Sequence, residues 1–141
     1  MELDDAVLAF VRERQAGILA TIKRDGRPQL SNIMYSVTDE GIIRISVTAD
    51  RAKTKNITRD PRVSLHVLRE DFWAYVVIDG DAELSPVSTE PGDATGQELA
   101  DMYRALSGEH PDWDDYFRAM VADKRQVLRI RPTHAYGMLG C

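Results

Sequence analysis

Short runs in which apolar and polar residues alternate follow one another through most of the chain, with turn residues between them. Alternation with a period of two is typical of strands that bury one face. The Asp25-Gly26 pair between the first two runs predicts a tight hairpin turn. Because most connections are short and the runs do not alternate regularly with helices, an antiparallel barrel is favoured over a doubly wound parallel sheet. Strands are expected at residues 18–22, 29–37, 42–48, 63–68, 73–78 and 126–130, and the fifth resumes at 82–84 after a bulge or bend at Gly80.

Helices are expected among these strands. Residues 3–14 place apolar side chains at helical spacing, and residues 97–106 and 113–123 follow a loop at 85–96 that is rich in Pro, Ser, Thr, Gly and Asp. A further short helix is predicted between Asp50 and Asp60. After the last strand, Pro132 precedes a tail that contains His134 and Tyr136. The predicted fold class is therefore mostly β, a barrel with helices.

Composition narrows the classes of function. The 141 residues predict one domain, residues 1–141, that can bury a core without metals or disulfides. A formal net charge of −5 argues against nonspecific nucleic-acid binding, which needs an extended positive surface. No apolar run resembles a signal peptide or reaches the length of a membrane span, so a cytoplasmic protein without membrane contact is expected.

The cysteine and histidine residues of the sequence do not indicate a metal site or a catalytic thiol. Cys141 is the single cysteine, which excludes an intrachain disulfide and a zinc cluster, and its terminal position disfavours a catalytic thiol. His66, His110 and His134 lack the spacing of metal ligands. His134 is equally open to a structural and a functional interpretation. No metal is expected, and no dinucleotide or Walker loop occurs.

The basic stretch from residue 51 to residue 62 contrasts with the acidic chain around it. Five cations stand there against one acid: Arg51, Lys53, Lys55, Arg59 and Arg62 against Asp60. Asp50 is the predicted N-cap of the helix, and Pro61 follows its predicted end. Cations beside the free N–H groups of a helix start are unfavourable unless an anion lies between them, and a phosphate is the natural candidate. A solvated basic helix face explains the charge equally well.

Two further features are compatible with a flat ligand. Gln29, Ser31 and Asn32 put polar side chains in a predicted barrel strand, where a heterocycle edge or solvent could pair with them. Trp73 and Tyr75 are one strand step apart and could cover a planar ring, although a core aromatic pair is the commoner arrangement. A phosphorylated, flat, hydrogen-bonding ligand such as a flavin would bind to all three features: the basic helix start, the polar strand residues and the aromatic pair.

Several runs of residues resemble one protein family. They are 20–32, which contains Gly-Arg-Pro-Gln-Leu-Ser-Asn, 51–56 (Arg-Ala-Lys-Thr-Lys-Asn) with Asp60-Pro61, 73–75 (Trp-Ala-Tyr) and 134–137 (His-Ala-Tyr-Gly). Over essentially its whole length the chain resembles the pyridoxamine 5′-phosphate oxidase-like split β-barrel superfamily, FMN-binding antiparallel Greek-key barrels, and most closely the branch that uses the deazaflavin coenzyme F420. The chain is too short for the extra substrate-phosphate region of true pyridoxamine phosphate oxidases, which argues against vitamin B6 chemistry.

The resemblance implies a homodimer with cofactor sites at the subunit interface. It assigns Arg51, Ala52 and Lys53 to the phosphate-binding segment, with Ser46 nearby on the preceding strand. It assigns Gln29, Ser31 and Asn32 to the strand that lines the ring, and Trp73 and Tyr75 to the partner subunit or the facing strand. The expected activity is hydride transfer between reduced F420 and a conjugated organic substrate. An FMN-dependent oxidoreductase and a carrier of F420 or a tetrapyrrole without turnover are the alternatives.

Overall fold

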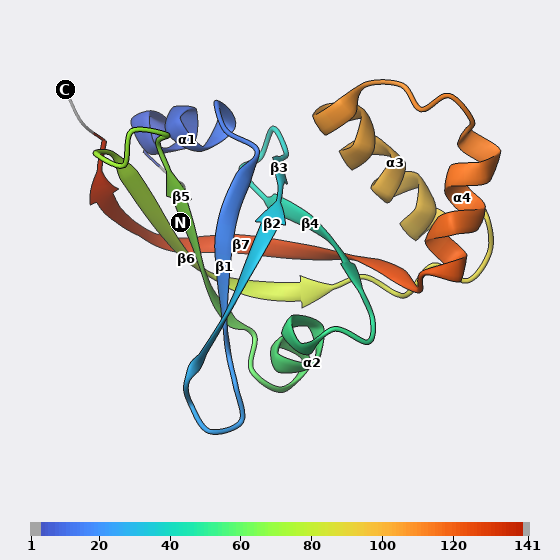
Figure 1. Ribbon diagram of the computed structural model, residues 1–141, viewed down its shortest axis with the longest axis horizontal. Helices are drawn as coiled ribbons and strands as arrows, with labels where there is room; N and C mark the ends of the chain where they lie inside the picture. Colours follow the sequence, from blue (N-terminus) through green and yellow to red (C-terminus); the bar gives the residue numbers. More distant parts are fainter. Residues whose placement is uncertain (1–3, 140–141) are drawn as a thin grey trace.

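The computed structural model describes residues 4–139, which form one curled antiparallel sheet flanked by helices (Figure 1). Within this range the sheet order is β2-β1-β5-β6-β7-β4-β3. The strands are β1 (Ala16–Ile22), β2 (Pro28–Met34), β3 (Ser36–Val37), β4 (Ile43–Thr48), β5 (Arg62–Leu68), β6 (Tyr75–Leu84) and β7 (Arg125–Met138). The helices are α1 (Asp5–Arg12), α2 (Ala52–Arg59), α3 (Ala94–Ser107) and α4 (Trp113–Ala122). The predicted mostly β barrel with helices is confirmed.

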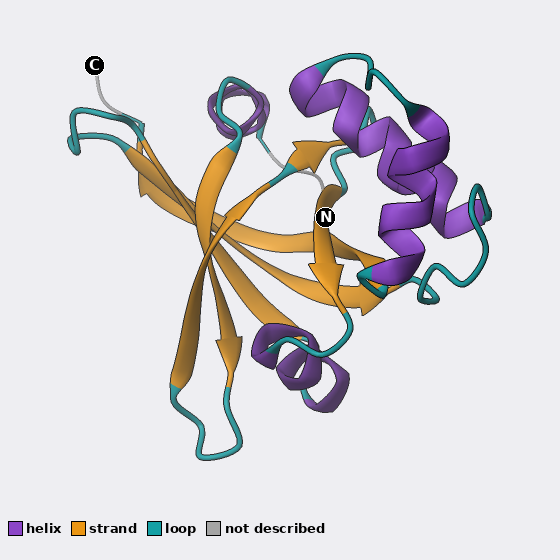
Figure 2. Ribbon diagram, turned by 45° about the vertical axis from the view of Figure 1, so that its right-hand side comes forward, coloured by secondary structure: helices purple, strands orange, loops and turns teal. Residues whose placement is uncertain are grey.

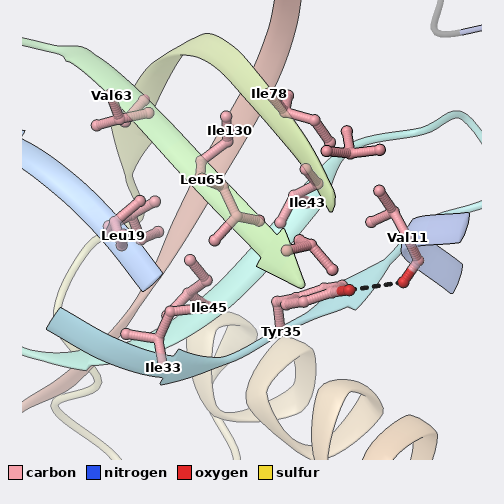
Figure 3. Close-up of a cluster of buried hydrophobic side chains, with 14 of the residues drawn as sticks. Val11, Leu19, Ile33, Tyr35, Ile43, Ile45, Val63, Leu65, Ile78 and Ile130 are labelled. Carbon is pink, nitrogen blue, oxygen red and sulfur yellow. Dashed lines mark hydrogen bonds between the residues drawn. The ribbon is translucent and has the colours of Figure 1, made fainter. Parts of the chain in front are cut away.

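The core fills the concave side of the sheet. Alternate residues of β4 and β5, such as Ile43, Ile45 and Leu65, are fully buried, as the period of two predicts. Tyr35 is also buried, and its hydroxyl donates a hydrogen bond to the carbonyl oxygen of Val11 at 2.6 Å (Figure 3). Burial raises the pKa of the Tyr35 hydroxyl above its ordinary value. This bond fastens α1 over one end of the half-barrel.

The helices α3 and α4 lie side by side against one end of the sheet (Figure 2). They form a second apolar cluster, in which Leu99 and Met102 of α3 pack with Tyr116 of α4. The Glu98 carboxylate of α3 accepts hydrogen bonds from Arg129 on β7. This charged contact fixes α3 against the sheet.

Gly80 marks an irregularity, as predicted. The register between β6 and β7 shifts between Asp79 and Gly80, which leaves Thr133 of β7 as the extra residue. A Cβ atom at residue 80 would approach the carbonyl oxygen of Arg131 to 2.6 Å, so only glycine fits. The bulge also accommodates Pro132, which cannot donate to a regular ladder.

Several predicted boundaries were wrong. The tail with His134 is instead the second half of β7, paired with β6 along its whole length. The return strand ends at Met34, and the chain then crosses to the other sheet edge, where Ser36–Val37 pair with β4. The third helix begins at Ala94 because Asp93 caps it, accepting a hydrogen bond from the N–H of Gly96.

None of the helices in residues 4–139 is both long and apolar enough to cross a bilayer. The terminal Cys141 lies outside the described residues.

Candidate functional site

The start of α2 differs from its predicted form. Asp50 is not the N-cap, because the Arg51 N–H bonds to the Thr48 carbonyl oxygen at 3.2 Å and Asp50 lies inside this turn. Arg51 takes the N-cap position with extended backbone angles, and no side chain caps the helix. The first-turn N–H groups therefore keep their partial positive charge available to an anion.

Three cations converge at this helix start, and we call Arg51, Lys53 and Arg125 the basic cluster. The Arg51 Nε donates to the Thr48 hydroxyl at 3.2 Å, and within residues 4–139 neither Arg51 nor Lys53 forms an ion pair. Burial lowers the pKa of the Lys53 amine, and the charges of Arg51 and Arg125 lower it further. Like charges held together, two of them without an ion-pair partner in the described chain, are typical of anion sites.

Arg125 is the member of the basic cluster that sequence reasoning missed. It opens β7, its Nη1 donates to the Ser46 hydroxyl at 3.4 Å, and its Nε lies 3.9 Å from a carboxylate oxygen of Asp123. Ser46 faces away from the core on β4 and thereby lies beside Arg125. The pairing of β4 with β7, which places residue 125 opposite residue 48, could not be deduced from local pattern.

Two hollows meet at Arg125. A cleft of about 530 Å³ extends over the start of α2, and three cations and two acids line it: Arg51, Lys124 and Arg125 with Asp50 and Asp123. A second hollow of about 340 Å³, which we call the helix groove, runs between the sheet and α3–α4. Its apolar walls include Met34, Leu99, Met102 and Met120, and Ser46 and Arg125 line it as well. An anionic group and an apolar body can therefore lie next to each other here.

The polar residues of β2 are divided between its two faces. Gln29 and Ser31 are half-buried on the core side, whereas Asn32 is exposed on the outward side together with Met34 of the helix groove. The side chains of Gln29 and Ser31 thus point away from the groove, and only Asn32 shares its face.

The outer edge of β2 pairs with no strand of the described chain. The Lys23 N–H bonds to the Arg27 carbonyl oxygen and the Tyr35 N–H to that of Gln15, so odd-numbered residues of β2 direct their backbone groups to β1. The backbone N–H and C=O groups of Leu30 and Asn32 consequently point to the open edge. They can pair with the edge of a heterocycle.

The expected aromatic pair does not lie on one strand. Trp73 belongs to the β5–β6 turn, where its N–H bonds to the Asp71 carboxylate at 3.0 Å and its side chain is 77% exposed. Tyr75 opens β6, with its ring 5.6 Å from that of His66. This turn and α2 lie at opposite ends of the sheet (Figure 1). A single chain therefore does not bring Trp73 or Tyr75 to the basic cluster.

Hydrogen bonds to β1 hold α2 in place. The Asn56 amide donates to the Thr21 hydroxyl of β1 at 3.1 Å, and both side chains are buried. Arg59 donates to the Asn56 side-chain oxygen and to the Ile22 carbonyl oxygen, each at 2.9 Å. Arg59 is therefore a structural cation, whereas Lys55 is exposed. Within the described chain, no group of three or more His, Cys, Asp or Glu is arranged as metal ligands.

Comparisons with known proteins agree with this architecture. The family model of pyridoxamine 5′-phosphate oxidase matches residues 3–139. A conserved hypothetical protein from Mycobacterium tuberculosis is 28% identical, with a TM-score of 0.76, and the match covers 96% of this chain and 84% of that one. A protein described as an F420 reductase is 25% identical, with a TM-score of 0.69, and the match covers 91% of this chain and 94% of that one.

More distant neighbours share the fold alone. The haem storage protein HutZ from Vibrio cholerae is 16% identical, with a TM-score of 0.68, and the match covers 98% of this chain and 96% of that one.

Proposed function

Because the chain belongs to the pyridoxamine 5′-phosphate oxidase family, as the match over residues 3–139 and the split β-barrel show, we propose that it is a coenzyme F420-dependent oxidoreductase. It would transfer a hydride between reduced F420 and a conjugated organic substrate. The observation that carries this proposal is the basic cluster, which lies at an uncapped helix start beside an apolar groove. The similarity to a protein described as an F420 reductase supports the choice of cofactor.

The residues present suit a phosphorylated, flat cofactor. Arg51 and Lys53 would hold the phosphate, and the N–H of Ala52 in the uncapped first turn adds a further donor. Each charge-assisted contact contributes about 1.5–3 kcal/mol. The open edge of β2 at Leu30 and Asn32 would pair with the polar edge of the ring.

When bound, reduced F420 would supply the hydride from C5 of its deazaflavin ring. The protein's own contribution would be binding and orientation: Arg51 and Lys53 would fix one end of the cofactor, and the apolar walls of the helix groove would exclude water from the reacting face. No side chain is assigned as the proton donor.

We also propose that two copies of the chain complete each site. The turn that carries Phe72 and Trp73 is strongly exposed, and both side chains are 77% accessible. Tyr136 and Met138 are exposed near it on β7. Apolar exposure of this extent is typical of an interface. In a homodimer, Trp73 and Tyr75 of one protomer would reach the cofactor that the other protomer binds.

The test is a fluorescence titration of the protein with F420, FMN and haem. We expect F420 to bind most tightly and Arg51→Ala to raise its dissociation constant roughly ten-fold or more. Arg24→Ala, in the exposed β1–β2 turn, is the matched control and should leave the isotherm unchanged. Preferential FMN or haem binding, or an Arg51→Ala isotherm equal to that of the wild type, would contradict the proposal.

A carrier without turnover is the second candidate, since proteins described as haem-binding share the fold. Stopped-flow measurement separates the two functions. An oxidoreductase oxidises reduced F420 when a conjugated acceptor is added, whereas a carrier leaves its absorbance unchanged.

A further inference from the structure

The helix groove contains one charged side chain on otherwise apolar or hydrogen-bonded walls. Met34, Leu99, Met102 and Met120 supply apolar surface, and the Tyr116 hydroxyl is already bonded to the Leu99 carbonyl oxygen at 3.0 Å. The charge is that of Arg125. A neutral apolar ligand would cover this partly exposed guanidinium and would offer it no acceptor to replace water.

The bonding capacity of Arg125 is largely unused. A guanidinium has five N–H donors, and this one makes a single long hydrogen bond, from Nη1 to the Ser46 hydroxyl at 3.4 Å. Its Nε is buried without a hydrogen-bond partner, and the Asp123 carboxylate oxygen stands 3.9 Å away. Arg51 and Lys53 are available for the cofactor phosphate, so the remaining N–H donors of Arg125 can bind a second anion.

We propose that the helix groove is the pocket of the organic substrate and that Arg125 anchors a carboxylate of that substrate. The substrate class is then a conjugated, mainly apolar compound with one carboxylate. A planar guanidinium matches a carboxylate through two parallel hydrogen bonds, and the nearby Asp123 disfavours a ligand of higher negative charge. This inference rests on the proposed F420-dependent function.

The position of the groove suits a reacting partner of the cofactor. Met34 lines the groove and lies on the same outward face of β2 as Asn32, where the ring is proposed to bind. Hydride transfer needs the two reacting atoms about 3–3.5 Å apart. A substrate in the groove would lie next to the ring.

The test compares a conjugated acid with its neutral ester, trans-cinnamate and methyl cinnamate, by calorimetric titration of the protein with and without F420. We expect Arg125→Gln to weaken cinnamate binding roughly 10- to 100-fold and to leave methyl cinnamate binding unchanged. Arg125→Lys should retain part of the preference. Arg118→Gln, which removes the same charge from an exposed side of α4, is the matched control.

Several outcomes would overturn the inference. They are a wild-type protein without preference for the acid, an equal loss for acid and ester in Arg125→Gln, and a loss of F420 affinity as large as that of Arg51→Ala. The last result would place Arg125 in the phosphate site. If the wild type prefers the acid but binds no F420, the proposed function fails and the carboxylate pocket stands.

A steric variant gives an independent measurement. Met120→Trp should fill the groove and weaken the binding of both probes at least ten-fold, which corresponds to about 1.4 kcal/mol. F420 affinity should stay within roughly two-fold of the wild type. Unchanged affinity for both probes would show that they bind elsewhere and would overturn the inference. Circular dichroism verifies that each variant is folded.

Discussion

At the scale of single residues, Lys53 is the most informative side chain. It is half-buried between two guanidinium groups, and burial followed by the charges of Arg51 and Arg125 lowers the pKa of its amine. Such a placement disfavours the charged form in the folded protein. A bound phosphate would reverse the effect, because it adds the missing negative charge. The unfavourable arrangement is thus consistent with a binding role.

The pH dependence of F420 affinity follows from this shift. Phosphate favours the protonated amine, so affinity is complete below the pKa of Lys53 and falls as the pH rises through it. Since that pKa lies below the ordinary 10.5, the dissociation constant should rise at a pH where a normal lysine is still charged. Titrations with F420 at pH values between neutral and the ordinary lysine pKa measure this rise in the dissociation constant. Lys53→Arg should remove the decline, and an identical decline in this variant would refute the assignment.

At the scale of secondary structure, α2 depends on its anchors as much as on its sequence. Its eight residues are too few to form a stable helix alone. The Thr54 hydroxyl donates to the Thr48 carbonyl oxygen at 2.8 Å, and Asn56 joins the helix to Thr21 of β1. These bonds determine where the basic cluster lies.

Asn56→Ala should loosen this attachment. The change leaves the Thr21 hydroxyl buried without its partner, at a cost of about 1–3 kcal/mol in the free energy of unfolding. F420 affinity should fall as well, because α2 no longer holds Arg51 and Lys53 in position. Urea unfolding and fluorescence titration measure the two effects. Lys55→Ala, exposed on the same helix, should change neither.

Tyr35→Phe tests the attachment of α1. The substitution removes the 2.6 Å bond to the Val11 carbonyl oxygen, which still accepts a hydrogen bond from the Arg14 N–H at 3.2 Å. We therefore expect a loss of about 0.5–1.5 kcal/mol in the free energy of unfolding, measured by urea denaturation, without a change in F420 affinity. An equal loss of affinity would mean that α1 supports the cofactor site directly.

At the scale of the whole molecule, the components of the proposed site are separated. The basic cluster lies at one end of the sheet, whereas the turn with Trp73 lies at the other (Figure 1). One chain cannot bring them together without breaking the barrel. For this reason we proposed above that a second copy of the chain supplies the turn.

Trp73→Ser should therefore affect assembly and binding together. We expect the wild type to sediment at twice the 15.9 kDa of one chain, and the variant to dissociate more readily and bind F420 more weakly. Analytical ultracentrifugation and fluorescence titration are the measurements. Gln97→Ser, on an exposed position of α3, serves as control. A monomeric wild type that binds F420 normally would rule out the shared site.

Local pattern was sufficient for much of the fold. Alternation of apolar residues predicted β4 and β5, the Asp25-Gly26 turn predicted the first hairpin, and Gly80 predicted the bulge. Charge density alone directed attention to Arg51 and Lys53. These features succeed because they depend on neighbours within a few residues, where side-chain direction follows from the backbone.

Long-range pairing decided the rest. Whether the chain after Ile130 is a tail or a strand depends on β6 as its partner, and the N-cap of α2 depends on the turn at Thr48. Arg125 joins the basic cluster only because β7 pairs with β4. The sequence by itself thus determined a mostly β barrel and pointed to a basic helix as its candidate site. Only the tertiary structure could assemble the groove beside that helix, because its walls come from segments whose contacts form when the sheet closes.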